Sequence, residues 1–230
     1  LSKKYQDNDG NPQLYTDVAV RSSGTAEDMP DASFAGQQET YLNVRGKQKV
    51  LESIRNCFAS LYTDRAISYR KSMGYSEDVH ISVCVQKMVR SDLGSAGVAF
   101  SIDPESGFKD VILINSSWGL GEMVVGGSIQ PDEIIVFKNT LSEGYFPIID
   151  KKLGLKNQKM IYGTNPDQKT KIVSVDIGRQ NSFSINRVQI LKLSKWIMLI
   201  EDYYTEKLGK WTPLDVEWAV DGLSGDLYIV

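Results

Sequence analysis

Runs of apolar residues divide the chain into helices and strands. Between residues 47 and 69 apolar positions recur every three or four residues, which predicts a long amphipathic helix that ends near Gly74. The same spacing predicts a second long helix over residues 188–204, with Ser184 or Asn186 as its N-cap. Strands are expected where β-branched and alternating residues cluster, at 18–22, 79–89, 96–102, 111–116, 133–138, 159–162, 171–175, 214–219 and 227–230.

The order of these elements indicates an α+β fold. Most strands follow residue 80 instead of alternating with helices, which favours a mixed, mostly antiparallel sheet over a doubly wound parallel one. The natural division follows the strand at 79–89 and gives two lobes, residues 1–89 and 90–230, with ligands expected in a cleft between them. The chain starts at Leu1 without a methionine and stops within a strand-like segment, so we expect it to be a piece of a longer protein.

Composition narrows the class of protein. With 41% hydrophobic and 24% charged residues, the 230-residue chain is typical of a globular protein. A net charge of −3 and a pI near 5.3 disfavour a nucleic-acid binder. The sequence contains no run of about 18 apolar residues, so we expect no membrane-spanning segment. Cys57 and Cys84 are interpreted as reduced core thiols. His80, the only histidine, is more simply structural than catalytic.

The end of the first predicted strand and the segment after it have the residue types of a phosphate-binding loop. Arg21 supplies a fixed cation, Ser22, Ser23 and Thr25 supply hydroxyl donors, and Gly24 lets the backbone approach a ligand. The spacing is not that of a Walker A loop. An ordinary polar turn with Arg21 in a surface ion pair explains the same residues.

A second glycine-rich turn, Trp118-Gly119-Leu120-Gly121-Glu122, follows the predicted strand at 111–116. The Gly-x-Gly pattern alone is weak evidence for a ligand loop. Within it, Glu122 either binds a sugar hydroxyl or caps the following turn.

Two carboxylates lie two residues apart in the strand at 214–219. Asp215 and Glu217 therefore share one face of the strand, where their like charges repel unless a cation lies between them. A divalent ion such as Mg²⁺, held by one or two carboxylates and by substrate phosphates, would explain the pair. A solvated strand face is the alternative.

Four segments in order along the chain resemble one family. The segment VAVRSSGTAEDMPDASFAGQQET at 18–40 resembles the signature of the nucleotide-binding domain of the phosphoenolpyruvate synthase (pyruvate, water dikinase) family. The segments VQKMVRSD at 85–92, SWGLGE at 117–122 and DVEWA at 215–219 are similar to its later blocks. Pyruvate phosphate dikinase and rifampicin phosphotransferase share this domain, but YTDRAISYR at 62–70 and PDE at 131–133 are more similar to the synthase.

The resemblance implies an ATP-grasp fold of two lobes with two long helices, and ATP and Mg²⁺ as cofactors. Arg21 would contact the transferred phosphates, and Glu122 would face the ribose. Glu217, with Asp215, would hold Mg²⁺ in the second lobe. The remaining implied contacts are residues that line the triphosphate, Ser22, Ser23, Thr25, Gly36 and Gln37, and residues of the adenine hinge, Gln86, Met88 and Val89.

The resemblance also implies what lies outside this chain. A family lysine that contacts the phosphates would precede Leu1, and a metal-binding glutamine and an arginine would follow Val230. A phosphohistidine domain and a pyruvate-binding barrel would belong to the same full-length protein, and His80 does not fit the phosphohistidine motif. The whole enzyme would be cytoplasmic and would make phosphoenolpyruvate, AMP and phosphate from ATP, pyruvate and water, while the fragment alone is expected to be inactive. A related dikinase, an antibiotic phosphotransferase and a non-catalytic nucleotide-binding module are the alternatives.

Overall fold

The structure is a computed structural model, and it divides the chain into two compact units. One unit comprises Leu1–Met88 with Thr164–Lys169, and the other comprises Val89–Gly163 with Thr170–Val230. Each unit is described by itself. The residues that the structure describes are 5–6, 12–13, 16–24, 28–29, 32–33, 40–72, 74, 80–163 and 169–230.

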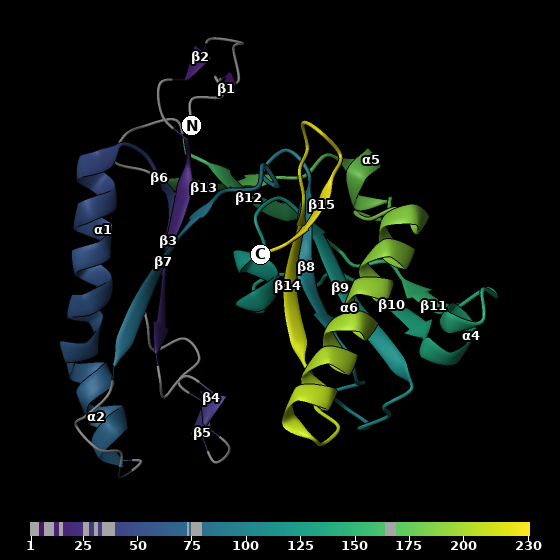
Figure 1. Cartoon of the computed structure of the whole chain (residues 1–230). Helices are drawn as coiled ribbons and strands as arrows, with labels where there is room; N and C mark the ends of the chain where they lie inside the picture. The colour runs from purple at the N-terminus through teal and green to yellow at the C-terminus, as the bar shows by residue number, and fades with distance from the viewer. Residues whose placement is uncertain are drawn as a thin grey trace. The chain divides into compact units, whose positions relative to one another are not determined.

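The first unit is built on a three-stranded antiparallel sheet with the order β6-β3-β7, formed by Thr40–Val44, Val18–Gly24 and Ile81–Lys87. Helix α1 (Lys47–Ala59) lies along this sheet (Figure 1), and its Cys57 packs with Val20 and Val44 in a small core. The unit also holds two short strand pairs, β1 (Tyr5–Gln6) with β2 (Pro12–Gln13) and β4 (Asp28–Met29) with β5 (Ala32–Ser33).

The first expected long helix is interrupted. Helix α1 passes into the 3₁₀ turn η1 (Ser60–Tyr62), and a separate helix α2 (Asp64–Ser72) follows. The break lies at Thr63, whose backbone is extended and whose hydroxyl accepts a hydrogen bond from the Ala66 amide at 3.3 Å. A Thr or Ser side chain that bonds to nearby backbone groups in this way competes with the regular helical pattern, so apolar spacing alone did not reveal the break.

The second unit contains a six-stranded sheet, covered on one face by the long helix α6 (Arg187–Leu208) (Figure 1). Every pair of neighbouring strands in it is antiparallel. The order is β11-β10-β9-β8-β14-β15, formed by Ile148–Lys152, Asp132–Phe137, Val111–Trp118, Ser95–Phe100, Asp215–Val220 and Leu227–Ile229. The α+β class and the C-terminal hairpin expected from the sequence are confirmed.

The core of this unit lies between the sheet and α6. Ile114, Ile134 and Trp218 of the sheet pack with Ile190 and Leu193 of the helix, and all are fully buried. The remaining elements are the hairpin β12 (Gln158–Tyr162) with β13 (Thr170–Ser174) and the short helices α3 (Glu122–Val125), α4 (Lys138–Ser142) and α5 (Ile177–Gln180).

Helix α6 begins with a capping box. The Asn186 side chain accepts a hydrogen bond from the Gln189 amide at 3.0 Å, and the Gln189 side chain accepts one from the Asn186 amide at 3.1 Å. Of the two candidate caps, Asn186 is therefore the residue used. The helix ends at Gly209, whose φ of 67° is the left-handed conformation that glycine adopts readily.

A buried ion pair ties the start of β10 to the loops before β12 and α6. The Asp132 and Lys156 side chains are both completely buried and form a salt bridge. Lys156 Nζ also donates to the Gly154 carbonyl at 3.0 Å and to the Gln180 carbonyl at 3.3 Å. Asp132 accepts from the Gly154 amide at 3.0 Å and from the Ser184 amide and hydroxyl, each at 2.8 Å. All three N–H donors of the Lys156 ammonium group thus have an acceptor.

The two cysteines differ in their exposure to solvent. Cys57 is buried as expected, but Cys84 is exposed, because it lies on the side of β7 that faces away from the α1 core.

Within the described part of the chain, no helix combines the length and the apolar character needed to cross a bilayer.

Candidate functional site

Arg21 and its neighbours lie on a strand, not in a loop. Strand β3 continues through Gly24. It pairs with β7 along its whole length and with β6 as far as Arg21, which stands opposite Thr40 of β6 and Cys84 of β7. The predicted strand at 18–22 is confirmed and extends two residues further, so the expected loop is wrong for Ser23 and Gly24. Ladder hydrogen bonds with β7 use part of the backbone that a loop would have offered to a ligand.

Strand geometry separates the candidate residues of β3. Alternation places Ser22 on the same side as Val20, which packs in the α1 core, and places Arg21 and Ser23 on the opposite side. Gln86 pairs with Ala19 and so shares the side of Arg21 and Ser23. Three other candidates, Thr25, Gly36 and Gln37, lie outside the described residues.

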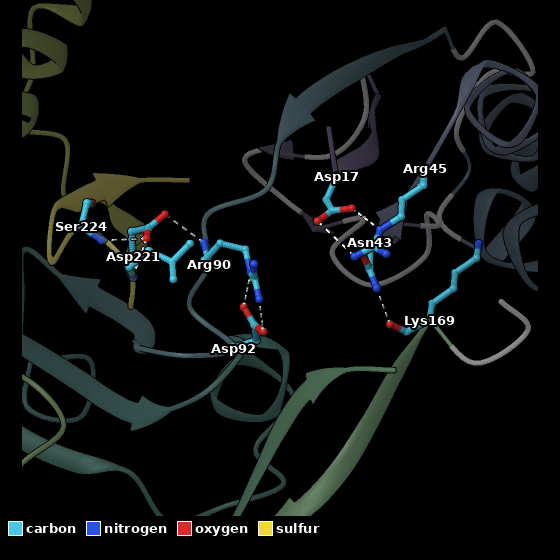
Figure 2. A network of polar contacts seen from close by, with 9 residues as sticks. Asp17, Asn43, Arg45, Arg90, Asp92, Lys169, Asp221 and Ser224 are labelled. Carbon is cyan, nitrogen blue, oxygen red and sulfur yellow. Dashed lines mark hydrogen bonds and ion pairs between the residues drawn. The ribbon is translucent and has the colours of Figure 1, made fainter. Parts of the chain in front are cut away.

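The backbone next to Gln86 is fixed by the start of β3. The Met88 amide donates to the Asp17 carbonyl at 2.9 Å. The Asp17 side chain in turn pairs with the Arg45 guanidinium, and nearby the Asn43 side-chain Nδ2 donates to the Lys169 carbonyl at 2.9 Å (Figure 2). The Met88–Asp17 bond therefore ties the residue after β7 to the residue before β3.

Val89 begins the second unit and is followed by a clamp of polar contacts. Arg90 makes a bidentate ion pair with Asp92, at 2.9 and 3.0 Å, and the Arg90 amide donates to the Asp221 carboxylate at 3.3 Å (Figure 2). The Gly222 amide donates to the Arg90 carbonyl at 3.0 Å. The segment that follows Val89 is therefore anchored to the turn at the end of β14, the strand that carries the candidate metal carboxylates.

Asp215 and Glu217 occupy the face of the six-stranded sheet opposite α6. Trp218 of β14 is fully buried in the core beside that helix. Because successive side chains of a strand point to opposite faces, Asp215 and Glu217 lie on the other face. Asp215 is exposed and Glu217 is half-buried. Among the residues that the structure describes, no group of three His, Cys, Asp or Glu side chains is arranged to hold a metal ion.

Glu122 lies on the same face of the sheet. The preceding Gly121 packs on Ala96 of β8, where an added Cβ would stand 3.4 Å from the Ala96 Cβ. Ala96 and Val98 share a side of β8, and Val98 pairs directly with Glu217. The structure therefore brings Glu122, Asp215 and Glu217 to one face of one sheet.

The glycine-rich turn is held close to the β12 strand. Gly119 has a φ of 88°, and a Cβ there would stand 2.5 Å from the Met160 carbonyl, so only glycine fits this position. The Leu120 amide donates to the same carbonyl at 2.9 Å.

Two cations border this turn. Arg179 stacks over the Trp118 ring at 5.1 Å, and the Trp118 indole N–H donates to the Arg179 carbonyl at 2.9 Å. Lys159 lies beside Gly119, and its pKa is lowered by burial first and by repulsion from Arg179 second, against the opposing pull of Asp92 and Asp176. Neither cation was predicted as a site residue from the sequence.

The fold and this face define the class of protein: an α+β domain in which carboxylates, a glycine-rich turn and nearby cations form a polar surface on an antiparallel sheet. The family model of the pyruvate phosphate dikinase AMP/ATP-binding domain matches residues 1–230, and the chain belongs to this family. The resemblance found in the sequence motifs is thus confirmed.

Curated relatives carry the name phosphoenolpyruvate synthase. The protein of Aquifex aeolicus is 57% identical over 231 residues, which cover 100% of this chain and 26% of the relative. The protein of Escherichia coli is 50% identical over 215 residues, or 92% of this chain and 26% of the relative. The protein of Pyrococcus furiosus is 42% identical over 228 residues, or 96% of this chain and 26% of the relative. The chain therefore spans about a quarter of the length of these relatives.

Proposed function

We propose that this chain is the ATP-binding part of a phosphoenolpyruvate synthase, a cytoplasmic phosphotransferase that makes phosphoenolpyruvate, AMP and phosphate from ATP, pyruvate and water. One observation carries the proposal: the AMP/ATP-binding family model matches the whole of residues 1–230, and relatives of that name are up to 57% identical to the chain. The two units are proposed to be the two lobes of an ATP-grasp fold, divided near residue 89.

The proposed phosphate contacts lie on β3 and in the segments that follow it. Arg21 offers planar, fixed donors that suit phosphate oxygens, and it shares its side of β3 with Ser23. Ser22, Thr25, Gly36 and Gln37 complete the proposed triphosphate contacts. The position of Ser22 on the α1 side of β3 makes it the weakest member of this set.

The proposed nucleoside contacts lie where the chain leaves β7 and in the glycine-rich turn. Gln86, Met88 and Val89 are proposed to hold adenine, and the Arg90 clamp keeps the backbone after Val89 in place for this role. Glu122 is exposed at the first residue of α3, and we propose that it accepts hydrogen bonds from the ribose hydroxyls.

The residues present fit a hard divalent cation. Asp215 and Glu217 offer only carboxylate oxygens, and Mg²⁺ is usually held by one or two such groups together with substrate phosphates. When bound, Mg²⁺ would neutralise charge on the phosphates. Phosphoryl transfer passes through a loose transition state that asks chiefly for alignment and charge neutralisation. The work of this chain is therefore to hold the phosphate chain in line, with Arg21 as a cationic contact.

The phosphoryl acceptor would lie elsewhere in the full-length protein. A histidine of a phosphohistidine domain would take the phosphoryl group and pass it to pyruvate bound in a barrel domain, which gives phosphoenolpyruvate. His80 is exposed at the start of β7, and we assign it no part in the transfer.

Incubation of the full-length protein with ATP radiolabelled in its β-phosphate, without pyruvate, tests the proposal, because formation of AMP places the β-phosphoryl group on the protein and releases the γ-phosphate. We expect AMP to form and label to become attached to the protein. Glu217→Gln should reduce both by about 100-fold or more, because the variant loses a charged ligand at the reacting phosphates. Glu206→Gln, on the exposed side of α6, is the matched control and should change neither. Formation of ADP instead of AMP, or full activity in Glu217→Gln, would overturn the proposal.

A further inference from the structure

Strand β9 carries two polar atoms for which the described part of the chain offers no hydrogen-bond partner. Ile112 and Ile114 point to the α6 core, so Leu113, Asn115 and Ser117 belong to the opposite face. The Asn115 Oδ1 and Ser117 Oγ atoms are both buried, and neither has a partner among the described residues. Buried polar atoms of native proteins nearly always have a hydrogen-bond partner. The two unpaired oxygen atoms of Asn115 and Ser117 therefore need an explanation, such as a bound ligand.

Asn115 lies in the same cross-strand row as Glu217. Glu217 pairs with Val98 on β8, and Val98 pairs with Asn115 on β9. Because neighbouring strands are about 4.8 Å apart, the Glu217 and Asn115 backbones stand about 10 Å apart with only Val98 between them. A cation held near Glu217 therefore lies within reach of the Asn115 carboxamide, either directly or through a coordinated water.

We propose that Asn115 is a further ligand of the metal–nucleotide complex, and that its Oδ1 atom contacts the divalent cation directly or through one water. This inference rests on the proposed function. Amide oxygens are suitable ligands for hard cations, and an uncharged ligand does not add to the repulsion between carboxylates and phosphates. The row Glu217, Val98 and Asn115 then provides one charged and one neutral oxygen donor across three strands.

A purely structural role explains Asn115 poorly. Leu113 occupies the next position on the same side of β9, and Val98 stands beside Asn115, so an apolar residue would suit this row without leaving an unpaired acceptor. Residues that break a local rule of this kind are expected at functional sites. Replacement of Asn115 by leucine should therefore preserve or raise the stability while weakening metal-dependent binding.

Calorimetry of ATP binding to the full-length protein, with Mn²⁺ and with EDTA, tests the proposal. Asn115→Leu should raise the half-saturating Mn²⁺ concentration by about 10-fold or more, without lowering the melting temperature and without changing ATP affinity in EDTA. Asn115→Asp should shift the Mn²⁺ requirement in the opposite direction, because a charged oxygen attracts the cation more strongly. Asn139→Leu, on the exposed surface of α4, is the matched control and should behave as wild type.

The outcomes separate this inference from the function on which it rests. An Mn²⁺ requirement within about 2-fold of wild type in both Asn115 variants would overturn the inference while leaving the proposed function intact. A loss of affinity that is equal in Mn²⁺ and EDTA, or that follows a fall in melting temperature in both variants, would assign Asn115 a structural role and also overturn it. Failure of the wild-type protein to bind ATP at all would overturn both.

Discussion

Replacing Lys156 by methionine removes the positive charge from the buried network that joins β10 to the loops before β12 and α6. Asp132 would remain completely buried, with only neutral donors from Gly154 and Ser184 around its carboxylate. Removing one partner of a buried ion pair costs about 3–5 kcal/mol, because it leaves an uncompensated charge. Three neutral donors to the Asp132 carboxylate remain in the variant. We therefore expect a loss of stability at the lower end of this range, about 3 kcal/mol.

The surface pair Lys152–Glu133 provides the matched control. Its atoms are 3.3 Å apart, and the side chains are 60% and 40% exposed. Solvent screens such a pair, so Lys152→Met should cost about 1 kcal/mol or less. The two variants remove the same charge from neighbouring parts of the same unit and differ in burial.

Hydrogen exchange measured by mass spectrometry on the full-length protein gives the local readout. Peptides that contain the Gly154 and Ser184 amides should exchange about 100-fold faster in Lys156→Met, which corresponds to about 3 kcal/mol, and should remain protected in Lys152→Met. Equal protection of these peptides in the two variants would refute the reasoning that burial makes the Lys156 pair important.

Three smaller predictions follow from local contacts. The Ser106 hydroxyl is the main cause that lowers the pKa of Asp103 from 3.8, so this carboxylate stabilises the fold above its unfolded pKa and loses that contribution as the pH falls through the folded value. In Ser106→Ala, an NMR titration should show the Asp103 pKa rising, and an unchanged pKa would contradict the assignment. Asn186→Ala should cost about 1 kcal/mol in thermal unfolding because α6 loses its cap; a cost near zero would show that the capping box does not contribute. A thiol reagent should modify Cys84 in the native protein and Cys57 only after unfolding, as peptide mapping can show, and equal rates would contradict their different burial.

Local patterns predicted the elements that depend on local interactions. The apolar spacing identified the long second helix, and two candidate caps, Ser184 and Asn186, bracketed its start. The structure shows that Asn186 is the cap, through a capping box with Gln189. The break at Thr63 escaped the same reasoning, since apolar periodicity continues through it. The extension of β3 from Ser22 to Gly24 was also missed, because small hydroxyl residues suggest a loop until their pairing with β7 is known.

The candidate site depends on contacts that sequence spacing does not reveal. The shared face of Asp215 and Glu217 follows from the period of a strand, and the structure agrees. The position of Asn115 in the row of Glu217 requires the register of three strands. The Asp132–Lys156 pair likewise joins residues that are 24 positions apart through a loop in which Lys156 itself has a φ of 38°.

Photolabelling with an azido-ATP analogue tests most directly whether this chain forms the nucleotide site. The full-length protein would be irradiated with the analogue and Mg²⁺, digested, and the labelled peptides identified by mass spectrometry. The proposed function predicts that the labelled peptides lie within residues 1–230 and that excess ATP with Mg²⁺ prevents the labelling. Labelling confined to peptides outside residues 1–230, and abolished by ATP there, would contradict it.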